Sequence, residues 1–214
     1  MSTDHAQLHG APVPLPRAVL GERAEVVAPQ LVGALLVREL SGVQVVARVV
    51  ETEAYREDDP ASHSHARRSP RTEPMFAAPG TAYVYRSYGV HWLLNVSVEP
   101  EGSGAAVLLR AATILQGQEA VSPRRPTARR HDDLLRGPAL LTTGLAVTGE
   151  DDDGRDLLTS GPRVWLGTDG WRPVAGDIAA GPRVGISQAA DVAWRFHLHG
   201  AGSVSRYRRS PRAP

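Results

Sequence analysis

The sequence lacks cysteine and lysine altogether, and only 11 of its 214 residues are aromatic. The absence of cysteine excludes thiolate nucleophiles, zinc–thiolate sites, iron–sulfur clusters and disulfide scaffolds. The absence of lysine excludes a lysine Schiff base and removes the lysine that a P-loop needs. All 24 basic residues are therefore arginine. The absence of cysteine also favours a protein of the reducing cytoplasm.

Long apolar runs are also missing. No segment reaches the roughly 18 apolar residues that a membrane span requires. Residues 1–17 are polar and interrupted by proline, unlike a signal peptide. The length favours one domain, and a chain of this size buries roughly 70% of its unfolded surface, so it needs no disulfide to fold.

The 21 glycines and 17 prolines indicate short strands and many turns. No alternation of strands and helices of the βαβ type is present. We therefore predict an α+β fold: a single compact domain over residues 15–210, with a mainly antiparallel curved β-sheet, flanking helices and flexible termini at 1–14 and 211–214. Strands are predicted over 43–55, 82–88, 92–98 and 105–112, weaker strands over 164–166, 183–186 and 194–198, helices over 29–40 and 138–147, loops over 56–80 and 124–130, and an acidic turn over 150–154.

One predicted strand carries two carboxylates on the same face. Because side chains alternate along a strand, Glu51, Glu53 and Tyr55 should point the same way. Two ionised carboxylates repel each other, so one should turn toward water or toward an arginine. A solvated sheet face is the simplest reading. The mostly apolar run 45–50 before it favours instead a buried strand that brings a catalytic group to a cleft.

Tyrosines are concentrated in one part of the chain, since four of the five lie between positions 55 and 88. Tyr83 and Tyr85 share a strand face, and a cross-strand aromatic ladder would explain Tyr83. Tyr88 precedes Gly89 at a turn and follows Arg86, a position more exposed than a core requires. Interleaved aromatic rings and guanidinium groups are typical of nucleic-acid surfaces.

Three arginine clusters lie on predicted loops or at the C-terminus. A net charge of +1 does not indicate nucleic acid by itself, but the clusters favour it. We take Arg67, Arg68 and Arg86 as candidate DNA-binding residues, while solvated loops remain the alternative, above all for the C-terminal tail. The clusters are Arg67, Arg68 and Arg71; Arg124, Arg125, Arg129 and Arg130; and Arg206, Arg208, Arg209 and Arg212.

His63 and His65 lie in the polar loop beside Asp58 and Asp59. Such a group could hold a metal, but no third ligand occurs at a recognisable spacing. We therefore predict no metal site, and we favour a histidine that packs against or hydrogen-bonds to a planar ligand.

Taken together, these motifs resemble the alkyladenine (3-methyladenine) DNA glycosylase family, in its mammalian-type branch with many bacterial members. The similarity covers about residues 15–210. It is carried by V-E-T-E-A-Y at 50–55, D-P-A-S-H at 59–63, M-F at 75–76, P-G at 79–80, Y-V-Y at 83–85, Y-G at 88–89, N-V at 95–96, V-L-L-R-A at 107–111, G-P at 137–138, G-P-R-V-G-I at 181–186, W-R-F at 194–196 and S-R at 205–206.

The resemblance implies excision of alkylated or deaminated purines from DNA. A damaged nucleotide is flipped out of the duplex, and water cleaves its N-glycosidic bond. The residue roles that it implies are a general base (Glu53) with an adjacent arginine (Arg110), base-pocket walls (Tyr55, His63 and Tyr85), a side chain that disfavours the guanine amino group (Asn95), positions near the DNA and the pocket floor (Met75 and Leu108) and a wedge in the duplex (Tyr88).

The sequence thus predicts a monofunctional, monomeric DNA-3-methyladenine glycosylase without lyase activity, without cofactor or metal, and located in the cytoplasm with the nucleoid. Its partner is double-stranded DNA that contains a damaged purine, with no membrane and no obligate protein partner. Two other readings remain open. One is a non-catalytic protein that binds damaged DNA with the same fold, and the other is a histidine-based metal hydrolase.

Overall fold

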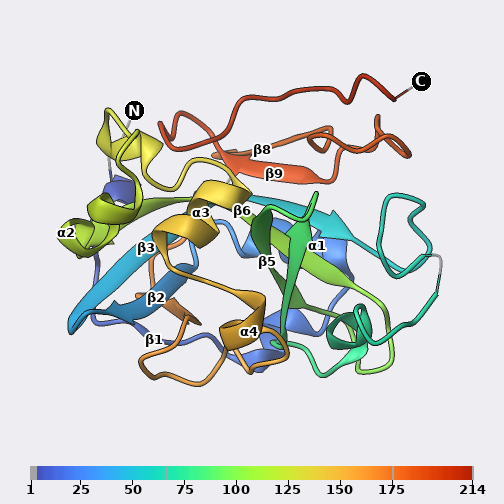
Figure 1. Cartoon of the computed structure of the whole chain (residues 1–214), viewed down its shortest axis with the longest axis horizontal. Helices are drawn as coiled ribbons and strands as arrows, with labels where there is room; N and C mark the ends of the chain where they lie inside the picture. Colours follow the sequence, from blue (N-terminus) through green and yellow to red (C-terminus); the bar gives the residue numbers. More distant parts are fainter. Residues whose placement is uncertain (1–3, 66, 175, 214) are drawn as a thin grey trace.

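The computed structural model describes residues 4–65, 67–174 and 176–213. Its strands form one nine-stranded antiparallel sheet in the order β1-β7-β2-β3-β6-β5-β4, and β9 joins β3 on one side and β8 on the other (Figure 1). The strands are β1 (Val13–Pro14), β2 (Leu35–Leu40), β3 (Val43–Tyr55), β4 (Ala82–Ser87), β5 (His91–Ser97), β6 (Ala106–Gln116), β7 (Trp165–Thr168), β8 (Ile178–Gly181) and β9 (Arg195–Leu198).

Strand β3 organises the sheet because it has different partners along its length. Its first half pairs with β2, and Glu51 to Glu53 pair with β9. Strand β6 follows it from Val46 to Tyr55 through three irregularities in register. Such bulges bend a strand and increase its twist. The pairing with β2 ends at Arg48, and the carboxyl-terminal part of β3 pairs with β9 instead.

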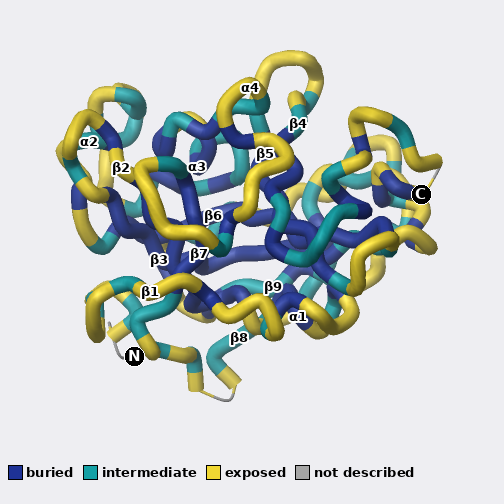
Figure 2. Tube along the Cα trace, turned by 90° about the horizontal axis from the view of Figure 1, so that it is seen from below, coloured by how far each residue is buried: buried dark blue, intermediate teal, exposed yellow. Residues whose placement is uncertain are grey.

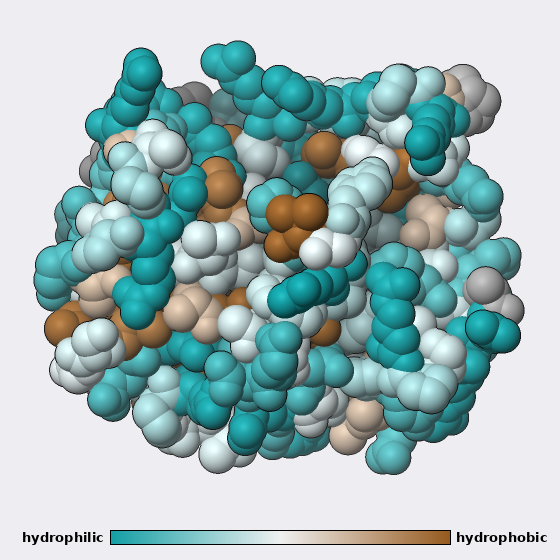
Figure 3. Space-filling model, in the orientation of Figure 1, coloured by the Kyte–Doolittle hydropathy of each residue, from teal (hydrophilic) through white to brown (hydrophobic). Residues whose placement is uncertain are grey.

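The helices are short. They are α1 (Ala24–Gln30), α2 (Gln118–Val121), α3 (Pro138–Gly144) and α4 (Gly149–Asp152), with 3₁₀ turns η1 (Asp4–Ala6), η2 (Arg17–Leu20), η3 (Glu73–Phe76), η4 (Ser122–Arg124) and η5 (His131–Asp133). Helix α1 packs on β3 and β6, and α3 packs on β5 and β6. The apolar side chains of these elements form the main core. The central strands are almost wholly buried (Figure 2), whereas the face seen in Figure 3 is mostly hydrophilic with small, separate apolar patches.

The predicted α+β class with a mainly antiparallel sheet is confirmed. The strand predicted over 43–55 has those bounds, and the strands and the helix predicted over 82–88, 92–98, 105–112 and 138–147 are present with shifted ends. The described part of the segment, residues 56–65 and 67–80, is the expected long loop and contains only the turn η3. Within the described residues no helix is long and apolar enough to cross a membrane.

The helix predicted over 29–40 is wrong. Helix α1 ends at Gln30, and residues 35–40 are strand β2, buried between β3 and β7. A strand buried on both faces gives a nearly continuous apolar run, which has no period that separates it from a buried helix. Gly42 does not end a helix either. Ser41 and Gly42, with φ of 54° and 78°, form the two-residue turn between β2 and β3.

The strand predicted over 183–186 is also wrong, because this segment is a loop. The Val184 amide donates to a carboxylate side chain, and Gly185 has a φ of 75°, which is outside the strand region. The acidic turn at 150–154 contains the end of α4, and the weak strands near 164 and 194 are β7 and β9. Strands β1 and β8, which are short, were not predicted.

Candidate active site

Glu53 lies near the carboxyl end of β3, between Leu108 of β6 and Arg195 of β9. Its side chain has no solvent exposure. One carboxylate oxygen, Oε2, accepts a hydrogen bond from the Tyr55 hydroxyl (2.8 Å), and the other, Oε1, accepts one from the Val184 amide (2.7 Å). The guanidinium Nη1 of Arg110 lies 3.2 Å from Oε2. These contacts fix the position of the carboxylate.

Arg110, from β6, also binds Glu51, the other glutamate of β3. Its Nε donates to Glu51 Oε1 at 2.8 Å, and Arg195 Nε donates to the same oxygen at 2.6 Å. Burial would raise the pKa of Glu51, but the charges of Arg110 and Arg195 and the Ser205 amide outweigh this and lower it. The negative charges of Glu51 and Glu53 are therefore balanced inside the fold by the positive charges of Arg110 and Arg195. The repulsion expected from the sequence is relieved by arginine and not by solvent.

Aromatic side chains lie beside this charged pair. The rings of His63 and Tyr85 are nearly perpendicular, with centroids 4.5 Å apart, and Tyr83 stacks on Tyr85 at 5.3 Å. His63 Nδ1 is hydrogen-bonded to the Tyr83 hydroxyl at 2.9 Å. Burial, followed by the charge of Glu53, raises the pKa of Tyr55 well above its usual value and that of Tyr85 to about 12. Both tyrosines thus keep their hydroxyl protons.

Two adjoining hollows open onto these rings. The larger has a volume of about 570 Å³ and is bounded by Glu53, Arg110, Leu108 and Tyr88. The smaller has about 100 Å³ and reaches down to Asn95 and Met75. They share four lining residues, namely Tyr55, His63, Tyr85 and Ile186. We call the two together the cleft.

The floor of the cleft comes from the pairing of β4, β5 and β6. Asn95 lies opposite Tyr83 on one side and Leu108 on the other. The Asn95 side-chain amide donates to the Tyr83 carbonyl at 3.0 Å, which fixes the orientation of the amide. Leu108 and Met75 are both buried. Met75 packs with Phe76, Tyr83 and Ala106 in a separate apolar cluster beneath the rings.

Tyr88 lies at the tip of the β4–β5 hairpin, at the mouth of the cleft. Its φ is 51° and that of Gly89 is 70°, and the Val90 amide donates to the Ser87 carbonyl at 3.1 Å. This is a turn with two left-handed residues, a conformation that a large aromatic residue rarely adopts. Tyr88 is 93% exposed and Val90 69%. The hairpin thus presents two apolar side chains to solvent.

The predicted DNA-binding arginines are more scattered. Arg86 lies over the ring of Trp92 at 4.5 Å and borders the cleft. Arg68 donates to Glu73 at 2.9 Å and lies over Phe76, so its charge is already paired. Arg67 is exposed. The structure therefore brings Arg86 to the cleft, and neither Arg67 nor Arg68 lines it.

The two histidines considered for a metal have separate partners. His63 is bonded to Tyr83, whereas His65 Nδ1 is bonded to the Glu57 carbonyl at 3.0 Å. Within the described ranges, no group of three or more histidine, aspartate or glutamate side chains is placed to hold a metal ion.

The sequence analysis did not name several residues of the site as site residues, among them Arg71, Arg183 and Val184. Arg71 lines the cleft and lies 5.6 Å from the centroid of Tyr85. Arg183 lies 4.7 Å from the centroid of Tyr55, and Val184 donates to Glu53. Arg71 belonged to a recognised cluster and could have been proposed. Arg183 is held by Asp59, far away in the sequence, and no local signal indicates that pairing.

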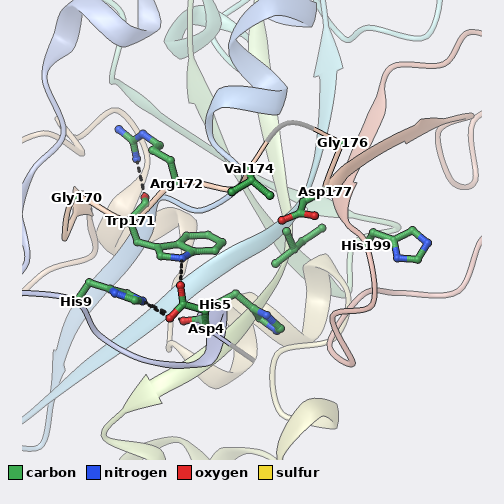
Figure 4. Close-up of a pocket in the computed structure, with 11 residues that line it drawn as sticks. Asp4, His5, His9, Gly170, Trp171, Arg172, Val174, Gly176, Asp177 and His199 are labelled. Carbon is green, nitrogen blue, oxygen red and sulfur yellow. Dashed lines mark hydrogen bonds and ion pairs between the residues drawn. The ribbon is translucent and has the colours of Figure 1, made fainter. Parts of the chain in front are cut away.

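A further hollow, of about 800 Å³, lies elsewhere, between η1 and the loop around Trp171 (Figure 4). Arg48 lies 4.6 Å from the centroid of the Trp171 ring and His9 lies 6.3 Å from it. The indole NH donates to Asp4 at 3.1 Å. None of the predicted site residues lines this hollow, so the cleft around Glu53 is the better candidate.

Comparison with known proteins identifies the family. The family model described as methylpurine-DNA glycosylase (MPG) matches residues 18–202. Proteins named "Putative 3-methyladenine DNA glycosylase" are similar over most of their length. The one from Nocardia farcinica is 46% identical over 84% of this chain and 87% of its own. Those from Burkholderia orbicola (41%; 89% and 90%) and Salinibacter ruber (42%; 86% and 93%) cover similar shares. The resemblance inferred from the motifs is confirmed, and the chain belongs to the methylpurine-DNA glycosylase family.

Proposed function

We propose that the chain is a monofunctional DNA-3-methyladenine glycosylase that hydrolyses the N-glycosidic bond of a damaged purine flipped out of duplex DNA. The observation that carries this proposal is the Glu53 carboxylate, held by Arg110 at the edge of a cleft lined by Tyr55, His63 and Tyr85. Its partner is DNA with a damaged purine. We place this activity in the cytoplasm with the nucleoid, in a monomer that needs no cofactor or obligate protein partner.

The contacts of Glu53 leave one acceptor site of its carboxylate free for a water. An ionised carboxylate has about four lone-pair sites. Tyr55 takes one on Oε2, which also forms the ion pair with Arg110, and Val184 takes one on Oε1. The remaining site on Oε1 can accept a proton from a water that approaches the sugar of a nucleotide in the cleft. Glu53 then acts as the general base.

For 3-methyladenine the reaction balances without a general acid. The water oxygen bonds to the sugar carbon C1′ while the bond from C1′ to the base nitrogen breaks. Both electrons of that bond go to the cationic base, which leaves neutral, and the water proton goes to Glu53. Positive charge that develops on the sugar is stabilised by the carboxylate. Arg110 keeps the carboxylate in place. No lysine side chain is present to form a Schiff base, so an intact abasic site is the expected product.

Recognition would use the aromatic walls. A planar base stacks on tyrosine and histidine rings, and a cationic base gains roughly 0.5–2 kcal/mol from each electron-rich face. His63 suits such a base because partial desolvation and the charge of Arg71 lower its pKa, which favours the neutral imidazole at neutral pH. Tyr88 would fill the space that the flipped base leaves in the stack.

The test is release of 3-methyladenine from methylated duplex DNA in the presence of EDTA, at enzyme in excess over DNA. We expect release by the wild type and a loss of at least 100-fold in rate for Glu53→Gln. Glu39→Gln, which changes an exposed glutamate of β2 outside the lining of the larger hollow, is the matched control. Binding of methylated DNA without release would indicate the non-catalytic binder. Loss of activity in EDTA would indicate a metal hydrolase.

A further inference from the structure

The C-terminal residues Ser205–Ala213, called the arm below, form neither helix nor strand and contain four arginines and no acidic residue. They follow the last residue of the family match, residue 202. In Figure 1 this red segment runs past β8 and β9 to the end marked C. The arm thus adds positive charge next to the strand that pairs with β3.

The arm begins at the buried charges of the active site. The Ser205 amide donates to Glu51 Oε2 and the Ser205 hydroxyl to Glu51 Oε1, each at 2.8 Å. Arg195 Nη2 donates to the Ser205 carbonyl at 2.8 Å. Two hydrogen bonds therefore fix the first residue of the arm to the carboxylate that holds Arg110, and a third fixes it to Arg195.

The arm is attached a second time at the 183–186 loop, which forms part of the rim of the cleft. The Gly185 amide donates to the Arg208 carbonyl at 3.2 Å. Gly185 lines the cleft, and its neighbour Val184 donates to Glu53. The backbone of the arm between Ser205 and Arg208 is therefore held along the rim of the cleft on the side of the 183–186 loop. Tyr88 bounds the same cleft from the β4–β5 hairpin.

The arginine side chains of the arm are mostly unpaired. Arg206, Arg208 and Arg212 are exposed, and none has a carboxylate within ion-pair distance among the residues that the structure describes. Arg209 differs, since it binds Asp191 at 2.7 Å. Free guanidinium groups gathered along one short segment suit a polyanion.

We propose that the arm is a phosphate-binding element that extends the DNA interface beyond the cleft and holds the duplex backbone on the side of the 183–186 loop. This inference rests on the proposed function, because it requires duplex DNA to lie across the cleft. Arg206, Arg208 and Arg212 supply the contacts. Guanidinium contacts to phosphate carry no base information, so the arm contributes equally on damaged and undamaged DNA.

The experiment compares the wild type with the triple variant Arg206→Gln, Arg208→Gln, Arg212→Gln on an undamaged duplex. Affinity is measured from 50 to 200 mM salt. Each lost phosphate contact reduces the slope of log K against log salt by about 0.9, so we expect a decrease of about 2 to 3. The control triple Arg23→Gln, Arg155→Gln, Arg172→Gln removes the same charge from exposed arginines that do not line the cleft. The slope for the control triple should differ by less than about 1 from that of the wild type.

Release of 3-methyladenine by the wild type is measured in parallel, so the two proposals can fail separately. If the wild type releases the base and the arm triple has the slope of the control triple, the arm proposal is overturned and the proposed function stands. If the arm triple has the reduced slope but the wild type releases no base, the arm proposal stands without the proposed function. A wild type that does not bind duplex DNA at all overturns both.

Discussion

Arg110 joins the two glutamates of β3: its Nε lies 2.8 Å from Glu51 and its Nη1 lies 3.2 Å from Glu53. Glu51 therefore holds the Arg110 guanidinium, which in turn holds Glu53, the proposed general base. Glu51 does not line the cleft, so its role is to position Arg110. The same Glu51 carboxylate accepts hydrogen bonds from Arg195 and Ser205. A change at Glu51 should act on Glu53 through Arg110.

Glu51→Gln should slow release of 3-methyladenine by about 10- to 100-fold, because the amide no longer matches the guanidinium of Arg110. Loss of a buried charge partner should also lower the free energy of unfolding by about 3–5 kcal/mol. Single-turnover rates and urea unfolding measure the two effects. Comparing the rate at saturating enzyme with the enzyme concentration that gives half of that rate separates positioning from mere destabilisation, since a displaced Glu53 slows the chemical step without weakening DNA binding. A variant with the wild-type rate at saturating enzyme would contradict a positioning role.

His63 gives a pH prediction for the pocket. Partial desolvation and the charge of Arg71 lower its pKa from 6.5. Arg71→Gln removes the second cause and leaves the first, so the pKa of His63 should rise but stay below 6.5. Because a protonated His63 repels a cationic base, release of 3-methyladenine at limiting enzyme should fall as pH drops through this pKa. The fall should begin at a higher pH in Arg71→Gln.

An NMR titration of the histidine ring protons measures this shift, with the His63 signal assigned by its loss in His63→Gln. Arg67→Gln is the control, because Arg67 belongs to the same arginine cluster but does not line the cleft. It should leave the pKa of His63 unchanged. An equal shift in both variants would mean that general surface charge, and not the Arg71 guanidinium, sets the titration.

The sequence predicts local features of this site better than distant ones. The alternation of side chains along 51–55 placed Glu51 and Glu53 on one side, and both indeed contact Arg110. The clustered tyrosines predicted an aromatic surface, and Tyr85 and His63 are in contact. These predictions depend only on strand geometry within one segment.

The failures have a common cause, which is that tertiary partners decide between local alternatives. Residues 35–40 became a strand because β3 and β7 lie on both sides of them. Residues 183–186 became a loop because the Val184 amide binds Glu53 and the Arg183 side chain binds Asp59. Neither partner is close in sequence, so neither composition nor periodicity could show it.

The buried pair of Arg48 and Asp169 predicts acid sensitivity. Burial would raise the pKa of Asp169, but the hydrogen bonds from Arg48, 2.7 Å away, and from the backbone lower it to about 2. A carboxyl whose folded pKa is below its unfolded value of 3.8 stabilises the fold above that value, and this contribution is lost as pH falls from about 4 to 2. The free energy of unfolding should therefore decrease over this range.

Asp169→Asn tests this by urea unfolding at pH 7 and at steps down to pH 3. Because Arg48 is left buried without its charge partner, we expect a loss of about 3–5 kcal/mol at pH 7 and a weaker dependence on pH below 4. Asp191→Asn removes an exposed partner of Arg209 and should behave like the wild type. An Asp169→Asn variant with wild-type stability at pH 7 would show that Arg48 finds another partner.

At the tip of the β4–β5 hairpin, we expect one substitution to raise stability and lower activity. Tyr88 is 93% exposed and has a left-handed backbone, so its ring adds little burial while its conformation is strained. Asparagine adopts this conformation more readily. Tyr88→Asn should therefore raise the free energy of unfolding by up to about 1 kcal/mol. It should slow release of 3-methyladenine from duplex DNA by at least 10-fold, because the wedge is lost.

The control is Ser41→Asn, in the turn between β2 and β3. Ser41 is also exposed and has a φ of 54°, but it does not line the cleft. It should show the same gain in stability with unchanged release. Comparing a duplex with a single strand that carries the same lesion isolates the wedge, since a single strand needs no base to be displaced. If Tyr88→Asn slows release equally on both substrates, the side chain acts within the pocket and not in the duplex.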